Sequence, residues 1–127
     1  NNPHSMGGWS SDSKSHVAHM EGGDFYGSEK SHVMMNADEV QIILESGGET
    51  KTLKDGLKLL QGEVVDAGVM SASALRKFLA DEISEANKQD VLFSLHMKAT
   101  MMKVSDPIIF GHCVSVFYEN VIQSKNL

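Results

Sequence analysis

One stretch of the sequence combines a lysine, a threonine and several methionines in a pattern that could serve chemistry. It runs from His96 to Pro107, reads HMKATMMKVSDP, and places Lys98 two residues before Thr100. Apolar side chains flank the lysine, contributed by Met97, Met101 and Met102. Because an apolar environment disfavours the charged form of an amine, it can lower the pKa of a lysine and make it a proton donor or acceptor. Thr100 could hydrogen-bond a ligand beside it.

Lys98 follows a segment whose alternating side chains predict a strand. In residues 91–97 one side is apolar and would face the core, while the other side carries Leu92, Ser94 and His96 and leads to Lys98. A strand end that feeds a loop is a common place for a catalytic group, because a rigid scaffold holds it. A lysine at the end of a sheet is more often simply solvated. Spacing alone therefore leaves both interpretations of Lys98 open.

The histidines and the cysteine are weaker candidates. His16 and His19 lie three residues apart, but a metal site needs several ligands converging from fixed spacings, so surface or core roles are favoured. Cys113 falls on the apolar face of a predicted helix and is interpreted as structural. The sequence contains no GxGxxG, GxxxxGK[ST] or GxSxG motif, and therefore no recognisable phosphate loop or nucleophile elbow.

Length and composition favour one globular domain over residues 1–127, with 41% hydrophobic and 22% charged residues. The net charge of −6 disfavours nucleic acid and anionic membrane surfaces as partners. No apolar run approaches the roughly 20 residues that a membrane span needs. A single cysteine allows no internal disulfide and fits a reducing, cytoplasmic location. Because the first residue is Asn and not Met, we expect a chain that was processed or cut from something longer.

The periodicity predicts an α+β fold: a mostly antiparallel sheet with two helices packed on one face, preceded by a Gly-rich N-terminal arm. The arm, residues 1–37, is rich in Gly, His and Ser and is interpreted as clasp-like; residues 38–127 give a hairpin, a strand, a helix, a strand and a helix. A Gly pair between two β-rich runs is a hairpin signal. The expected strands are 16–20, 31–35, 39–45, 50–54, 62–70 and 91–97.

Two helices are predicted from their caps and apolar stripes. Ser71 or Ser73 can cap the first helix, because a serine oxygen satisfies the amides of the first turn. The second should begin with Asp106 as the N-cap and Pro107 at the first helical position. The stripe of the first helix is Leu75, Phe78, Leu79, Ile83 and Ala86, and that of the second is Phe110, Cys113, Val114, Phe117 and Val121.

Two long motifs resemble the monomeric-type NADP-dependent isocitrate dehydrogenases. HMKATMMKVSDPIIFG, from His96 to Gly111, is similar to the catalytic-lysine segment of that family, and MGGWSSDSKSHVAHMEGGDFYGSEK, from Met6 to Lys30, to the segment that opens the same region. The resemblance runs over essentially the whole chain but over a minor part of the family's length. It implies oxidative decarboxylation of isocitrate to 2-oxoglutarate with NADP and Mg or Mn, on one repeat of the family's second domain.

The resemblance also implies roles for individual residues. Lys98 matches the lysine that handles the proton of the substrate hydroxyl, and Thr100 matches a position at the substrate or cofactor edge. Tyr26, in the run DFYG, looks like the tyrosine with which the dimeric relatives protonate the enolate after carbon dioxide leaves. Lysine and phenol both suit proton transfer. An aromatic anchor in the arm is an equally good interpretation of Tyr26.

What is missing from the family pattern matters as much. The aspartates that bind the metal, the residues that clamp the substrate carboxylates and those that bind NADP match nothing in this chain, so it has no metal ligands and no known cofactor-binding residues of its own. We expect it to be inactive alone and to meet isocitrate only where the rest of the site is supplied. By analogy with the family's paired repeats we expect a homodimer, with the arm as a clasp. The alternatives are a stand-alone homologue that acts as a non-catalytic dimerisation or binding module, and a self-sufficient small enzyme.

Overall fold

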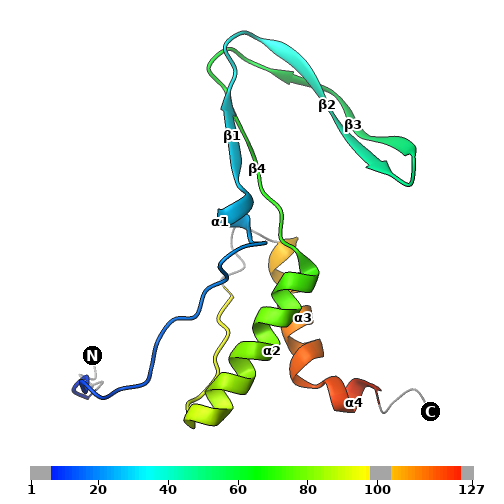
Figure 1. The fold of residues 1–127 in the computed structure, drawn as a ribbon. Helices are drawn as coiled ribbons and strands as arrows, with labels where there is room; N and C mark the ends of the chain where they lie inside the picture. Colours follow the sequence, from blue (N-terminus) through cyan, green and yellow to red (C-terminus); the bar gives the residue numbers. More distant parts are fainter. Residues whose placement is uncertain (1–6, 98–103, 124–127) are drawn as a thin grey trace, which may run out of the picture. The chain divides into compact units, whose positions relative to one another are not determined.

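The computed structural model describes residues 7–97 and 104–123, and these form four helices and four strands of an α+β fold (Figure 1). Two compact units divide the chain. One contains the residues up to Gly23 and those from Ser71 onward, and with them the three helices α2, α3 and α4. The other, Asp24–Met70, contains the short helix α1 (Phe25–Ser28) and all four strands. Residues 1–37 are therefore shared between the two units, and the prediction of one domain stays a prediction.

The longer ladder of the strand unit is the hairpin of β2 (Asp38–Ser46) and β3 (Glu49–Leu59), which pair antiparallel. The two residues between them, Gly47 and Gly48, have positive φ angles of 61° and 82°. A two-residue hairpin turn of type I′ needs positive φ at both positions, which glycine adopts without a steric penalty. The Gly pair thus sets the turn, and the predicted hairpin is confirmed. β3 is longer than predicted because it carries extra residues at two register shifts along the ladder.

A second antiparallel ladder joins β1 (Lys30–Val33) to β4 (Val64–Ala67), with Lys30 opposite Ala67 and Val33 opposite Val64. The predicted strands 31–35 and 62–70 are confirmed, in shorter form. The sheet is antiparallel as expected, but it consists of two separate two-stranded ladders. Helix packing on a sheet face stays a prediction.

Helix α2 (Ala72–Gln89) follows the sequence pattern closely. The Ser71 hydroxyl accepts a hydrogen bond from the Ala74 amide at 3.3 Å, which confirms one of the two proposed caps. The helix ends at Asp90, which adopts a left-handed φ of 56°. Leu75 and Leu79 are buried, and the other three residues of the predicted stripe are partly buried. The apolar stripe of this helix is confirmed.

Helix α3 (Ser105–Phe117) differs from its prediction in both its start and its buried face. It begins at Ser105 after Val104, with no side-chain cap, so Asp106 and Pro107 lie inside the first turn. Pro is tolerated there because the first amides of a helix have no partner within it. The predicted stripe was wrong except for Cys113: Phe110, Val114, Phe117 and Val121 are 37–55% exposed. The less exposed face is Ile109, His112, Cys113 and Val116. A helix that is apolar all round gives no periodic signal to select a face. The short helix α4 (Glu119–Gln123) follows it.

Two predicted strands are wrong. Residues 16–20 and 91–97 have no assigned strand structure and pair with no neighbour in the part of the chain that the structure describes. The physical reason is that a strand requires a partner ladder, which alternation along one segment cannot supply. Side-chain alternation itself is present in residues 91–97, where half-buried and exposed positions strictly alternate.

The buried apolar core of the described residues is small. It consists of Leu75, Leu79 and Cys113, contributed by helices α2 and α3, which contact each other. Many large apolar side chains are exposed, among them Leu92 at 93%, Trp9 at 79% and Leu53 at 56%. None of the helices within the described ranges is long and apolar enough to cross a bilayer.

Leu75→Ala should lower the free energy of unfolding by about 2–4 kcal/mol, because it leaves a cavity in the contact between the helices. Leu92→Ala removes the same atoms from a side chain that is 93% exposed and should change that free energy by less than about 0.5 kcal/mol. Urea denaturation followed by circular dichroism measures both. Equal effects of the two substitutions would contradict the assignment of the core.

Candidate functional site

The segment leading to the predicted catalytic lysine is described up to Met97, whereas Lys98 and Thr100 lie outside the described residues. The segment starts at the end of α2, where the Val91 amide donates to the Ala86 carbonyl at 3.0 Å. Beyond it, the apolar side chains of Val91, Phe93 and Leu95 are partly buried. The order of these residues along the segment therefore places Lys98 directly after an extended stretch, although not after a paired strand.

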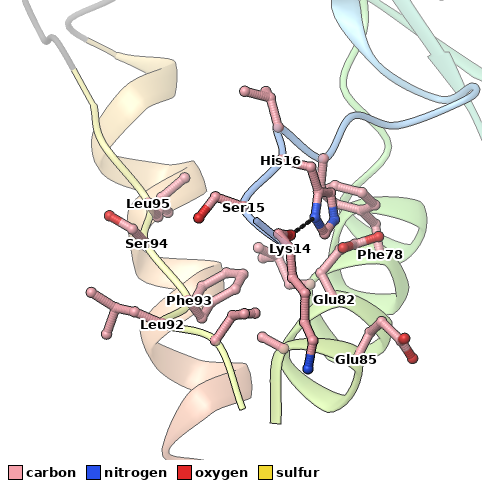
Figure 2. A pocket seen from close by; sticks show the side chains of 15 residues that line it. Lys14, Ser15, His16, Phe78, Glu82, Glu85, Leu92, Phe93, Ser94 and Leu95 are labelled. Carbon is pink, nitrogen blue, oxygen red and sulfur yellow. Dashed lines mark hydrogen bonds between the residues drawn. The ribbon is translucent and has the colours of Figure 1, made fainter. Parts of the chain in front are cut away.

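A pocket of about 470 Å³ lies in the helical unit, beside this extended segment (Figure 2). Three parts of the chain form its walls: residues 14–18, the face of α2 that carries Phe78 and Ala86, and residues 91–95. The lining is mostly apolar and includes Phe78, Leu79 and Phe93. An apolar cavity with a few polar groups at its edge is the usual form of a ligand or segment-binding site. This pocket was not predicted, because its walls are far apart in the sequence.

Two basic residues of the N-terminal segment belong to the pocket wall. The Lys14 ammonium donates a hydrogen bond to the Gln89 carbonyl at 3.1 Å, which fastens this segment to the C-terminal end of α2. The His16 ring Nδ1 lies 2.9 Å from the Lys14 carbonyl, so that nitrogen is the donor. Cations are favoured at a helix C-terminus, where free carbonyls concentrate negative charge. These contacts give residues 14–16 a structural role, in which His16 forms part of the pocket wall.

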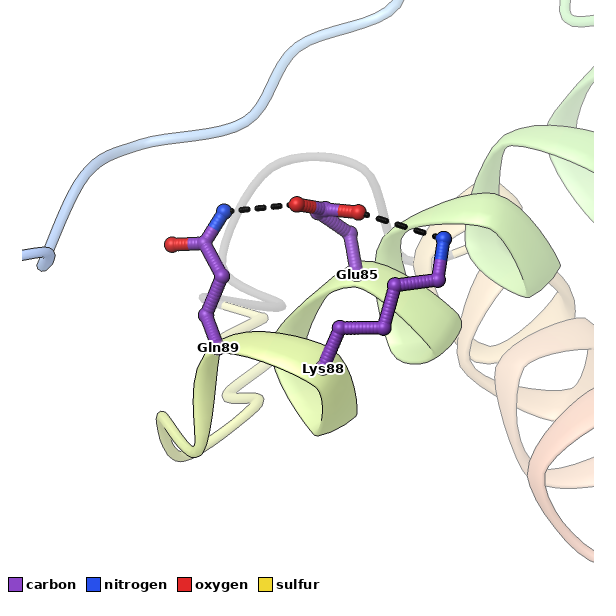
Figure 3. Close-up of polar contacts among 3 residues, drawn as sticks. All are labelled: Glu85, Lys88 and Gln89. Atoms are coloured by element: carbon purple, nitrogen blue, oxygen red, sulfur yellow. Dashed lines mark hydrogen bonds and ion pairs between the residues drawn. The ribbon is translucent and has the colours of Figure 1, made fainter.

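Glu85 contributes a carboxylate on the α2 side of the same pocket. Its oxygens accept hydrogen bonds from the Gln89 amide at 2.7 Å and the Lys88 ammonium at 3.4 Å (Figure 3). These bonds, first that from Gln89, hold the pKa of the Glu85 carboxyl below its ordinary value of 4.5. Glu85 therefore stays ionised at neutral pH and is unsuited to donate a proton.

Tyr26 lies in the strand unit, on the one-turn helix α1 (Phe25–Ser28). Asp24 caps this turn by accepting a hydrogen bond from the Gly27 amide at 3.0 Å. The Ser28 hydroxyl lies 2.8 Å from both the amide and the carbonyl of Val69, which ties the turn to the chain after β4. The Tyr26 side chain itself is 90% exposed. A buried anchor within its own unit is thus excluded, and the phenol is accessible to a partner.

The remaining candidates have no catalytic arrangement. Cys113 is buried, and burial raises the pKa of its thiol, which keeps it protonated; its structural interpretation is confirmed. His19 is exposed. Within residues 7–97 and 104–123 no three His, Cys, Asp or Glu side chains converge in a way that could hold a metal ion.

Comparison with known proteins identifies the family. A model described as "Monomeric isocitrate dehydrogenase" matches residues 1–126. The chain belongs to the monomeric isocitrate dehydrogenase family. It is 59% identical over 122 residues to "Isocitrate dehydrogenase [NADP] 2" of Colwellia maris, and 54% identical over 121 residues to "Isocitrate dehydrogenase [NADP]" of Azotobacter vinelandii. These alignments cover 95% and 94% of this chain but only 16% of each relative. The resemblance carried by the two long motifs is confirmed.

The relatives' names include NADP, so the residues present can be tested for groups that would hold a cofactor or a metal ion. No group of metal-binding side chains forms among the described residues, and the sequence has no phosphate-binding glycine loop. The described residues therefore do not fit a divalent metal ion on their own.

Two carboxyl groups interact in the strand unit. A hydrogen bond with Asp66 and the negative charge of that residue, followed by burial, raise the pKa of the Glu29 carboxyl above its ordinary value of 4.5. Glu29 directly precedes β1, and Asp66 lies in β4 opposite Ser31. The pair thus connects the ionisation of Glu29 to the stability of the β1–β4 ladder.

Glu29→Gln should make the strand unit more stable at neutral pH. A raised folded-state pKa contributes stability that is fully present below the unfolded value of 4.5 and is lost as the pH rises through the folded pKa. Glutamine imitates the protonated carboxyl at every pH, so the variant and the wild type should become equally stable once the pH falls below 4.5. Urea midpoints across this pH range measure the difference.

Glu49→Gln, at the start of β3 in the other ladder, is the matched control and should not reproduce that pH profile. A Glu29→Gln variant whose advantage did not change between acidic and neutral pH would contradict the interaction with Asp66.

Proposed function

We propose that this chain supplies the catalytic lysine of an NADP-dependent isocitrate dehydrogenase, and that other parts of a family enzyme complete the site. The observation that supports this proposal is the family match over residues 1–126, which includes the whole motif around Lys98. The relatives at 54–59% identity are named isocitrate dehydrogenase [NADP]. The chain spans 16% of their length, so the whole enzyme's activity is a proposal for it.

The proposed chemistry is proton transfer. Lys98, with its amine neutral, accepts the proton of the isocitrate hydroxyl while that alcohol is oxidised to the ketone. Thr100, two residues on, hydrogen-bonds the substrate and orients it. After carbon dioxide leaves, a phenol such as Tyr26 donates a proton to the enolate carbon and gives 2-oxoglutarate. General acid and base groups of this kind contribute about 10²–10⁴-fold to a rate.

The proposal assigns this chain no activity alone. The oxidation needs a hydride acceptor, and decarboxylation needs positive charge to stabilise the enolate. Among the described residues no group of His, Cys, Asp or Glu side chains could hold a metal ion that would supply this charge. A site completed from outside is therefore part of the proposal, and a functional test requires the remainder of a family enzyme.

Replacement of the matching 122-residue stretch of the Colwellia maris relative by this chain provides that test. The chimera should form NADPH from isocitrate and Mg²⁺, whereas the 127-residue chain should not. Lys98→Met in the chimera should lower kcat by about 10²–10⁴-fold. Tyr26→Phe should lower it similarly if the phenol donates a proton, and leave it unchanged if the ring only anchors the arm.

Lys77→Met serves as the control for Lys98→Met, because Lys77 is exposed and its one ion pair, 2.5 Å to Asp81, lies within α2. It should leave the rate within about twofold of the chimera, since exposed pairs contribute little. Turnover by the isolated chain, or full activity of Lys98→Met, would disprove the proposal.

A second candidate function is a non-catalytic dimerisation module. The observation that favours it is the β2–β3 hairpin, whose apolar side chains Ile42, Ile43, Leu44 and Leu53 are 46–56% exposed. An isolated two-stranded hairpin is marginally stable and exposes both strand edges, so it gains stability by pairing. All three charged side chains of β2 are acidic, namely Asp38, Glu39 and Glu45. β3 carries three lysines, Lys51, Lys54 and Lys58, against Glu49 and Asp55, so the opposite net charges favour contact between β2 of one copy and β3 of another.

A dimer of this kind should have twice the mass of the 13.9 kDa chain in size-exclusion chromatography with light scattering at micromolar concentration. Ile43→Lys should shift it to the monomer, because it places a charge in the apolar contact, whereas Val17→Lys, in the other unit and 90% exposed, should not. A monomeric wild-type chain would exclude this candidate and leave the first proposal intact.

A further inference from the structure

Helix α1 leads directly into the β1–β4 ladder, at the end where Lys30 lies opposite Ala67 (Figure 1). Continued by two residues, this antiparallel register would place Ser28 opposite Val69. The Ser28 amide is not available for such a pairing, because it donates to the Asp24 carbonyl within the helical turn at 3.1 Å. The link between the two chain segments at this position is made by the Ser28 side chain.

The Ser28 hydroxyl bonds the main chain of Val69 in place of a backbone partner. Its oxygen accepts a hydrogen bond from the Val69 amide at 2.8 Å and lies 2.8 Å from the Val69 carbonyl. The Asp24 carbonyl is also 2.8 Å away, and since a hydroxyl has one hydrogen, it donates to one of these two carbonyls at a time. Ser28 thus joins the residue that caps α1 to the chain after β4.

The α1 turn depends on contacts of this kind because it has only four residues. A helix this short is not stable by itself, since the first turn fixes several residues for a single hydrogen bond. Phe25 and Ser28, three residues apart on one side of the turn, are both partly buried. Phe25 lies against Gly68, where an added Cβ would be 3.5 Å from the ring Cδ1. The Tyr26 side chain, in contrast, is 90% exposed.

We propose that Ser28 is a positioning residue for Tyr26: its hydroxyl fastens the α1 turn to the β1–β4 ladder and so fixes the place of the exposed phenol. This inference rests on the proposed function, in which that phenol donates a proton. Because the Tyr26 side chain is so exposed, its position is set mainly by the backbone that carries it. A displacement of about 1 Å in a reacting group can lower a rate about 100-fold.

NMR relaxation of the backbone amides in the 127-residue chain tests the anchor. The Tyr26 amide should have an order parameter of about 0.85 in the wild type and below about 0.6 in Ser28→Ala, whereas Ser28→Thr keeps the hydroxyl and should keep the higher value. Ser115→Ala is the matched control, because the Ser115 hydroxyl bonds the carbonyl of Gly111, four residues earlier, as Ser28 bonds that of Asp24. Amides of β1 and β4 report whether each variant is folded.

Steady-state kinetics of the chimera test the consequence for catalysis. Ser28→Ala should lower kcat on the order of 10-fold and leave KM within about twofold, because the phenol acts after the substrate has bound. In the Tyr26→Phe background the same substitution should cause no further loss, since a positioning residue has no effect once the group that it positions is removed. Ser115→Ala should leave kcat within about twofold.

An order parameter for Tyr26 that does not change in Ser28→Ala would overturn the proposal. A loss of kcat that is equally large in the Tyr26→Phe background would overturn it as well, because Ser28 would then have a general structural role. Full activity of Tyr26→Phe would remove the proton donor itself, and that outcome is recognised without any change at Ser28. An inactive chimera contradicts the proposed function, while the NMR comparison still decides whether Ser28 holds the turn, so the two failures are distinguishable.

Discussion

The contact between α2 and α3 is the interaction on which the helical unit depends. The buried apolar side chains of the described residues, Leu75, Leu79 and Cys113, all belong to these two helices. Burying a leucine contributes roughly 2–3 kcal/mol, whereas ordering a residue's backbone costs about 1–2 kcal/mol. A core of this size therefore leaves little surplus. The surface that would enlarge it is present but exposed, on Phe110 and Phe117 of α3 and on Leu92.

The strand unit likewise leaves much of its apolar surface exposed. Each of its ladders has only two strands, and the β2–β3 hairpin exposes apolar residues along both strands. Two-stranded ladders become stable when a third strand or a helix covers one face. In both units the helices and strands are formed, but many of their apolar side chains stay exposed. This is the condition expected of residues that account for 16% of the length of their relatives.

Features of the fold that depend on neighbouring residues were predictable from sequence, and those that depend on distant ones were not. Gly47 and Gly48 set a turn through their own φ angles, and Ser71 caps α2 through an amide three residues away. The buried face of α3 was not predictable, because Ile108, Phe110 and Phe117 make it apolar on several sides. Pairing of residues 91–97 required a partner ladder, about which their alternation carries no information.

The candidate site also has features that the sequence predicts and features that it does not. Motif resemblance predicted the family, which is confirmed. The roles that it implies for Lys98, Thr100 and Tyr26 stay predictions, and the structure places Tyr26 on an exposed turn. The pocket beside residues 91–95 was missed, since Lys14 and Glu85 come together only through folding. Lys14 lies 75 residues before Gln89, whose carbonyl it binds at the C-terminal end of α2. Its role at the helix end was therefore not predictable, because the sequence does not reveal the path of the N-terminal segment.

The proposed catalytic role of Lys98 depends on how firmly the backbone before it is held. A general base must be held to within a fraction of an ångström of its productive position, and a side chain is held that well only when its backbone is fixed. Lys98 directly follows Met97, and within the described residues the backbone from Leu92 to Met97 makes no hydrogen bond. Under the proposed function, the parts of a family enzyme that complete the site must also fix this backbone. An incomplete enzyme would therefore lack a correctly placed base as well as its other groups.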